Sequence, residues 1–280
     1  MTQQNFKTSL PSLDLAMVTH GKEGLKRIGN TLLPPMEGIR YVVSWQNHDN
    51  GAIPEDIKER EDVEIHRLSM PGLSNKRNNA IEHCHGDIIL FADDDVKYSA
   101  EGLQKIREVY GGNPHLEFVL FRIILPGYKK YPADKIEIKL PFPKNYYVSS
   151  VEIAFRRDKI SGLRFWEEMG LGALSMHSGE DELFVISAIR RGINCRFINK
   201  YIAYHSHASS GQKTTSGILK GQGFITGIIY PFSGIIRVPL KAYRISRHND
   251  ISFFKALMNL SSGFLLYTLR LKKIPQQCRW

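Results

Sequence analysis

Three consecutive carboxylates, Asp93, Asp94 and Asp95, follow the short apolar run Ile88 to Ala92. The run has the length and composition of a buried strand, so we expect the acids to stand at the end of that strand. At about 5 Å and an effective dielectric constant near 20, each pair of like charges costs roughly 3 kcal/mol. A divalent cation offsets such a cost, because hard carboxylate oxygens suit Mg²⁺, Mn²⁺ or Ca²⁺. The alternative is an acidic turn that is simply solvated.

The direction of the three side chains follows from strand geometry. Side chains alternate along an extended segment, which predicts that Asp93 and Asp95 point one way and Asp94 the other. The result is an Asp-x-Asp pair at the carboxyl end of a strand. Open α/β sheets bind their ligands at this edge.

The elements around the acids read as alternating strands and helices. Such alternation predicts an α/β fold with a mainly parallel, Rossmann-like sheet covered by helices on both faces. The expected strands are Leu13–Val18, Ile39–Trp45, Val63–Leu68, Ile88–Ala92, Phe118–Leu125, Tyr147–Arg156 and Cys195–Tyr204. The expected helices are Glu23–Leu33, Leu73–Cys84 with Ser74 as N-cap, Ala100–Tyr110 and Gly179–Arg191, with loops at Thr19–Gly21, Gln46–Gly51 and Pro126–Pro143.

Composition narrows the class of protein. A chain of 280 residues can bury a sizeable core. Its three cysteines, Cys84, Cys195 and Cys278, are spaced for neither a disulfide framework nor a zinc site, which favours a reducing cytosol. Met1–Leu13 lacks an apolar signal core, and no run of 18 apolar residues predicts a membrane span.

The positive charge is concentrated at the C-terminal end. Residues 201–280 hold eleven Lys or Arg and a single acid, Asp250, whereas residues 1–200 hold 27 of each sign. The segment Ile251–Leu271 carries a broad apolar face interrupted by polar and basic residues. It reads either as a helix packed on the domain or as an amphipathic helix in contact with a membrane surface. We expect residues 211–280 to form a basic, amphipathic helical extension of a catalytic domain at 1–210.

Three motifs occur in a familiar order: GLSNKRNNAI at 72–81, GDIILFADDD at 86–95 and GEDEL at 179–183. Over residues 12 to 210 the chain resembles the family 2 glycosyltransferases, which are inverting enzymes with the glycosyltransferase A fold. The resemblance implies a sugar transferred from a nucleoside-diphosphate-sugar to a glycan acceptor. It also implies a donor-binding part at about 1–110 and an acceptor-binding part at 111–210.

The resemblance also implies roles for single residues. Asp95 would be a direct ligand of Mn²⁺ or Mg²⁺, Asp93 would share the metal or hold the ribose, and Asp94 would be structural. Arg77 and Asn78 would lie beside the nucleotide and its diphosphate. The catalytic base would be Asp181, with Glu180 hydrogen-bonded to the acceptor and Glu182 less certain. Direct attack on the donor with a single base inverts the anomeric configuration of the sugar. His205, with His207 as competitor, would complete the metal site.

The N-terminal half departs from the family pattern. Val18-Thr19-His20-Gly21 stands where relatives have Pro-Thr-Tyr/Phe-Asn after the first strand. Thr19 still matches the Thr of that motif and is expected at the donor. The second strand leads to Asp49 instead of the usual Asp-Asp-Gly-Ser, so Asp49 would accept a hydrogen bond from the base or sugar. Trp45 would either stack on the base or belong to the core.

Three functions remain in competition at this point. The first is a metal-dependent, inverting glycosyltransferase acting on a lipid-linked glycan at the inner face of a membrane, in cell-surface polysaccharide or lipopolysaccharide assembly. The second is a nucleotidyltransferase, which would release pyrophosphate instead of a nucleoside diphosphate. The third is a non-catalytic nucleic-acid-binding protein, although the chain shows no recognised nucleic-acid motif and we expect no nucleic acid. The sequence names neither the sugar, the acceptor, the linkage nor the oligomeric state.

Overall fold

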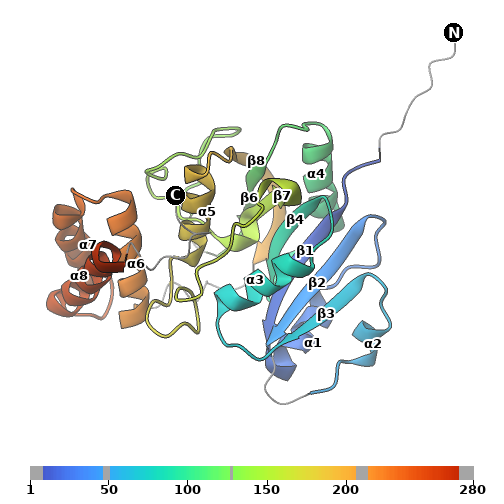
Figure 1. Cartoon of the computed structure of the whole chain (residues 1–280), viewed down its shortest axis with the longest axis horizontal. Helices are drawn as coiled ribbons and strands as arrows, with labels where there is room; N and C mark the ends of the chain where they lie inside the picture. Colours follow the sequence, from blue (N-terminus) through green and yellow to red (C-terminus); the bar gives the residue numbers. More distant parts are fainter. Residues whose placement is uncertain (1–8, 47–50, 127–128, 206–213, 271–280) are drawn as a thin grey trace, which may run out of the picture.

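The core of the protein is an eight-stranded sheet in the order β3-β2-β1-β4-β7-β6-β8-β5 (Figure 1). The structure, a computed structural model, describes residues 9–46, 51–126, 129–205 and 214–270, with the backbone only at 268–270. The strands are β1 (Leu13–His20), β2 (Ile39–Gln46), β3 (Val63–Leu68), β4 (Ile88–Asp93), β5 (Val96–Tyr98), β6 (Phe118–Ile124), β7 (Ile153–Arg156) and β8 (Cys195–His205).

Helices cover both faces of this sheet, as the alternating pattern predicts. Alternate residues of β1, such as Leu13 and Leu15, pack in one core with α1 (Gly21–Thr31) and α4 (Ala100–Gly111). Ala16 points to the other core, which holds α3 (Leu73–His83) and α5 (Glu180–Arg190). A single turn, α2 (Glu55–Lys58), lies between β2 and β3. The two cores fix the carboxyl ends of β1, β2 and β4 at a common edge.

The sheet is mixed rather than purely parallel: six strands share one direction, and the expected mainly parallel sheet carries two antiparallel strands. Strands β3, β2, β1 and β4 are parallel neighbours, and β6 is parallel to β8. The two short strands β7 and β5 run antiparallel to their partners. β5 has only three residues directly after the acidic turn, which is too short for a periodic signal.

Three local expectations were wrong. The strand predicted at Tyr147–Arg156 begins only at Ile153, because Ser150–Glu152 forms a 3-10 turn. Thr19 and His20 belong to β1, and Gly21 turns the chain directly into α1 with φ of +64°. Ser74 lies inside α3, whose N-cap position is Gly72, and its hydroxyl donates to the Met169 carbonyl at 2.6 Å.

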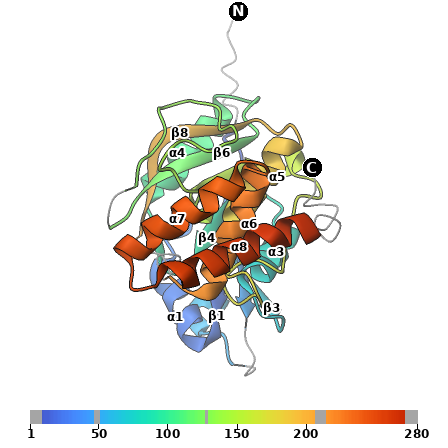
Figure 2. The same cartoon turned by 90° about the vertical axis from the view of Figure 1, so that its left-hand side faces the viewer.

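Three further helices lie beyond α5, at the end of the molecule away from β1–β3 (Figures 1 and 2). They are α6 (Ser216–Ile229), α7 (Gly234–His248) and α8 (Phe253–Arg270). α6 shares a core with α5 through Phe224, Ile225 and Leu183. Gly223 and Gly263 face the backbones of Leu260 and Lys220 respectively, where a Cβ would clash, so α6 and α8 approach closely.

No helix in the described ranges has both the length and the apolar content needed to cross a bilayer.

Candidate active site

The three acids at the end of β4 separate, and each meets a different partner. Asp94 accepts hydrogen bonds from the Thr19 hydroxyl at 2.5 Å and from Arg27 at 2.9 Å. Asp95 lies 3.5 Å from the imidazole of His205. Asp93 faces the guanidinium of Arg77 at 3.6 Å. The repulsion within the triplet is therefore relieved by guanidinium, imidazole and hydroxyl groups from four other elements, β1, α1, α3 and β8.

Arg77 links the motifs that lie far apart in the sequence. Its side chain is buried on α3, where it donates to Asp181 at 2.6 Å, to Ser150 Oγ at 2.5 Å and to Glu180 at 3.4 Å. Together with its ion pair to Asp93, these contacts join β4, the 3-10 turn and the first turn of α5. Arg77 is therefore a buried part of the site and does not lie solvated on the surface of α3. The guanidinium stands beside the acids that would face a diphosphate.

Asp181 is held in one orientation from two sides. One carboxylate oxygen accepts from Arg77, and the other accepts from the Ser150 backbone N–H at 2.9 Å. Each oxygen retains a second lone pair, so the carboxylate can still accept a proton or a hydrogen bond. Gly179 places this turn: its φ is +93°, and a Cβ there would press on Met169 and Ile225.

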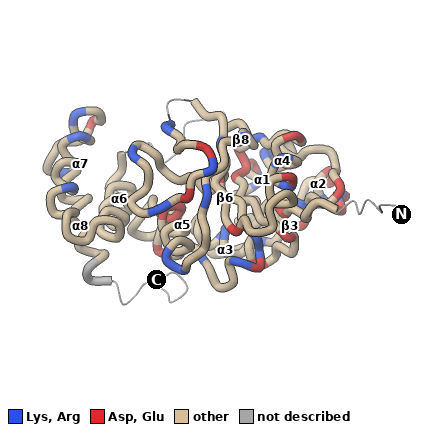
Figure 3. Tube along the Cα trace, turned by 90° about the horizontal axis from the view of Figure 1, so that it is seen from above, with Lys and Arg blue, Asp and Glu red and all other residues tan. Residues whose placement is uncertain are grey.

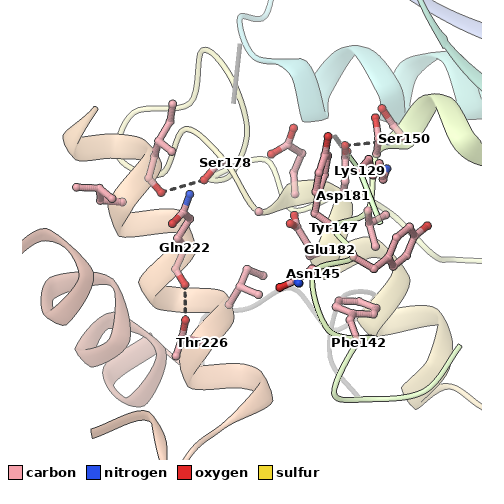
Figure 4. Close-up of a pocket in the computed structure, with 18 of the residues that line it drawn as sticks. Lys129, Phe142, Asn145, Tyr147, Ser150, Ser178, Asp181, Glu182, Gln222 and Thr226 are labelled. Carbon is pink, nitrogen blue, oxygen red and sulfur yellow. Dashed lines mark hydrogen bonds between the residues drawn. The ribbon is translucent and has the colours of Figure 1, made fainter. Parts of the chain in front are cut away.

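A cleft of about 1090 Å³ opens in front of Asp181 and Glu182. Its walls are α5, the loop 142–151, and the C-terminal helices α6 and α7. In Figure 4, Asp181, Glu182 and Tyr147 lie on one side of the space, and Gln222 and Thr226 of α6 lie on the other. Asp93 and His205 also line this cleft. The acidic motif of α5 and the end of β4 thus face one continuous space.

Two further carboxyl groups of α5 have perturbed acidity. Burial raises the pKa of Glu180 to about 8, with the negative charge of Asp181 adding to the effect and Arg77 opposing it. Burial and Asp181 likewise raise the pKa of Glu182 to about 7, against the attraction of Lys241 on α7. Burial lowers the pKa of Lys241 to about 8, which its attraction to Glu182 opposes. Glu182 therefore competes with Asp181 as a base, because a base works best with a pKa near the working pH.

The metal is expected at Asp93, Asp95 and His205, and the chemistry of these side chains shows whether they fit a divalent cation. Buried Asp93 Oδ1 accepts no hydrogen bond from any described residue, and its ion pair with Arg77 is long at 3.6 Å, so its lone pairs suit a cation. Burial raises the pKa of Asp93, while Arg77 opposes the shift. Within the described ranges, no three His, Cys, Asp or Glu side chains are grouped as a ready metal site. The donors fit Mn²⁺ or Mg²⁺ chemically, and the metal stays a prediction.

The remaining predicted residues are placed as follows. Buried Asn78 exchanges hydrogen bonds with the backbone of Phe165, at 2.8 and 3.0 Å, which fixes the loop beside α3. Thr19 is buried and reaches the site only through Asp94. Trp45 is fully buried and donates to the Gly21 carbonyl, so it belongs to the core. Asp49 and His207 lie outside the described residues.

Three groups at the site were missed at the sequence level. Lys76 adjoins Arg77 on α3; burial lowers its pKa, and the charges of Asp93 and Asp94 oppose the shift. Its position in the GLSNKRNNAI motif was a usable signal. Ser150 and Lys241 gave none, because their roles depend on contacts with α5 made by distant parts of the chain.

Comparison with known proteins identifies the class. Residues 50–166 match the family model described as glycosyl transferase family 2. This stretch includes α3, the acidic triplet and Ser150, and it marks a family 2 glycosyltransferase domain of glycosyltransferase A type. The chain is a glycosyltransferase.

Solved structures agree with this fold at low sequence identity. The crystal structure of S. aureus TarS 1–349 in complex with UDP has 17% identity and a TM-score of 0.54, covering 86% of this chain and 72% of that one. The complex of TarS 1–349 with UDP-GlcNAc has 14% identity and a TM-score of 0.56, covering 95% and 82%. The chain spans 44% of the longer S. aureus TarS structure. No curated protein matches the chain.

Proposed function

We propose that the protein is a metal-dependent, inverting glycosyltransferase that takes its sugar from a nucleoside-diphosphate-sugar. The carrying observation is the single cleft that Asp93 and Asp181 share, with Arg77 bonded to both. The UDP and UDP-GlcNAc named with the structurally similar TarS chains support a nucleotide-sugar as donor. The donor diphosphate would lie at the carboxyl end of β4, beside Arg77 and Lys76.

The base proposed for the transfer is Asp181. The acceptor oxygen forms a bond to the anomeric carbon as the bond to the diphosphate oxygen breaks. The acceptor proton goes to Asp181, whose orientation is fixed by Arg77 and Ser150. One displacement of this kind inverts the anomeric configuration, so an α-linked donor gives a β-linked product. Glu180, with its raised pKa, is suited to donate a hydrogen bond to the acceptor.

Asp95, Asp93 and His205 are the residues proposed to hold Mn²⁺ or Mg²⁺. When bound there, the cation would neutralise charge on the diphosphate leaving group as a Lewis acid. Arg77 supplies a fixed positive charge on the same side of the cleft. Asp94 keeps the turn in place through Thr19 and Arg27.

The acceptor proposed for the cleft is a glycan, carried on a lipid at the inner face of a membrane. Apolar residues such as Phe142 and Ile225, and polar ones such as Gln222 and Asn145, line the cleft as a sugar chain requires. The cleft borders α7, which carries four of the eleven Lys and Arg residues of the C-terminal part. Assembly of cell-surface polysaccharide or lipopolysaccharide is a process with such acceptors.

Thermal unfolding with a panel of nucleoside-diphosphate-sugars, in Mn²⁺ and in chelator, tests the donor and the metal together. A donor at 100 times its dissociation constant should stabilise the protein by about 2.7 kcal/mol. We expect stabilisation by at least one donor in Mn²⁺ and its loss in chelator. Asp95→Ala should abolish the metal dependence, and full activity of this variant would remove the metal assignment. Release of pyrophosphate in place of a nucleoside diphosphate would favour a nucleotidyltransferase.

A further inference from the structure

The outer side of the C-terminal helices exposes large apolar residues that no other part of the described chain covers. Phe232, in the turn before α7, is 89% exposed, and Ile236 of α7 is 66% exposed. On α8, Phe254 and Met258 are 74% and 72% exposed. We call these residues, with Ile235 and Tyr243, the terminal face. Figure 2 views the molecule from this end, with α7 and α8 in front of α6.

Helices α7 and α8 each bury one apolar side in the protein, and the terminal face is a second apolar side on the same helices. α7 buries Val238 and Ala242 against α6 and α8. Ile236 is two positions from Val238, which is about 200° around a helix with 3.6 residues per turn, so it points away from the core. On α8, Met258 stands in the same relation to buried Ala256 and Leu260. Packing within the protein therefore leaves the outward stripes unexplained.

The charge around these stripes is of one sign. α7 carries Arg237, Lys241, Arg244 and Arg247, and it contains no acid. Between Gly234 and Arg270 the one acid is Asp250, in the turn between α7 and α8. Figure 3 shows blue segments along α7, in contrast to the mixture of red and blue over the sheet. Exposed apolar residues flanked by exposed basic ones such as Arg244 and Arg247 are the pattern of helices that lie on anionic bilayers.

The same helix connects this surface with the active-site cleft. Arg237, Leu240 and Lys241 of α7 line the cleft, while Ile236 and Tyr243 point outward. We propose that the terminal face binds the surface of an anionic lipid bilayer and brings the mouth of the cleft to the headgroups. This inference rests on the proposed function only where it assigns the bilayer as the source of the acceptor.

Co-sedimentation of the full-length protein with phosphatidylcholine vesicles, with and without phosphatidylglycerol, tests the surface. We expect binding to vesicles that contain phosphatidylglycerol, weakened by salt. The double variant Phe232→Ser/Ile236→Ser should lose at least about tenfold in vesicle affinity, since each side chain gives up apolar burial in the bilayer. Arg247→Gln should lose about fivefold. Leu174→Ser, at a fully exposed apolar position in the loop that precedes α5, is the matched control and should bind as the unaltered protein does.

The outcomes separate this inference from the proposed function. None of the three substituted positions Phe232, Ile236 and Arg247 lines the cleft, so hydrolysis of the nucleotide-sugar should be unchanged in these variants. Vesicle binding without turnover of any donor would contradict the proposed function and would still support bilayer binding by the terminal face. Equal vesicle binding by the double variant and the control would contradict the assignment of the terminal face as a bilayer-binding surface. So would a dimer that the double variant dissociates while vesicle binding is absent, because a second copy would then be the occupant.

Discussion

Charged side chains are arranged in opposite ways around the acids and beside the terminal face. Near the acids, Arg77 is buried with Asp93, Glu180 and Asp181 within 3.6 Å or less, so opposite charges hold one another in fixed positions. On α7, Arg244 and Arg247 are exposed, and the helix offers them no acid. The first arrangement prepares a site for chemistry. The second leaves charge available for a surface outside the protein.

Replacement of Arg77, the cation at the centre of the acidic site, should have the largest effect on stability and transfer. Arg77→Met leaves buried Glu180 and the partly buried Asp93 and Asp181 without their partner, so we expect it to lower the free energy of unfolding by about 3–5 kcal/mol and to abolish transfer. Denaturant unfolding monitored by circular dichroism measures the loss. Arg77→Lys keeps the charge and should recover part of the stability. A loss under about 1 kcal/mol in Arg77→Met would show that the acids do not depend on this guanidinium.

The next largest effect on stability should come from the buried ion pair of Lys129 with Glu152, the last residue of the 3-10 turn. Lys129 lies 2.5 Å from Glu152, whose carboxylate also accepts from Tyr131 and Tyr146. Lys129→Met leaves a buried carboxylate unpaired and should cost about 3 kcal/mol of folding free energy. Lys129→Met/Glu152→Gln should cost less than the sum of the two single variants, because the pair acts as a unit. Strict additivity in denaturant unfolding would contradict this coupling.

A smaller effect should be a dependence of folding stability on pH through Glu180. The pKa of Glu180 is raised to about 8 from a usual 4.5, so the folded protein binds more protons than the unfolded chain between these values. Stability contributed by this residue therefore falls as pH rises from about 4.5 to 8. Glu180→Gln lacks this titration, so its stability relative to the unaltered protein should improve across the window. Parallel stability curves of the two proteins from pH 5 to 8 would argue against a protonated Glu180.

The smallest effect on folding should occur at Arg247, beside the terminal face. Arg247→Gln touches neither the cores nor the cleft, so its free energy of unfolding should change by no more than about 0.5 kcal/mol. Thermal unfolding measures the change, with Leu174→Ser as a matched surface control. A large destabilisation would mean that Arg247 serves the fold and would weaken the contrast drawn above.

The sequence predicted the sheet and its acids well where the signal was local. β1, β2 and β4 are mostly apolar and β3 alternates apolar with polar residues, so their positions followed from the sequence pattern, and the acids of the triplet followed from the end of β4. β5 is too short to show a period, and β7 begins late because Ser150 and Glu152 turn to reach Asp181 and Lys129. Burial of Arg77 could not be predicted, since its partners Ser150 and Asp181 lie 73 and 104 residues away.

Transfer by Asp181→Asn, compared with Glu182→Gln, tests the central claim most directly. Both variants keep the size of the side chain while removing its ability to take the acceptor proton. Release of nucleoside diphosphate, measured with a donor that stabilises the protein and with its acceptor, should fall by about 10²–10⁴-fold in Asp181→Asn. It should fall much less in Glu182→Gln. Near-normal turnover by Asp181→Asn, with the loss found in Glu182→Gln instead, would contradict the assignment of Asp181 as the base.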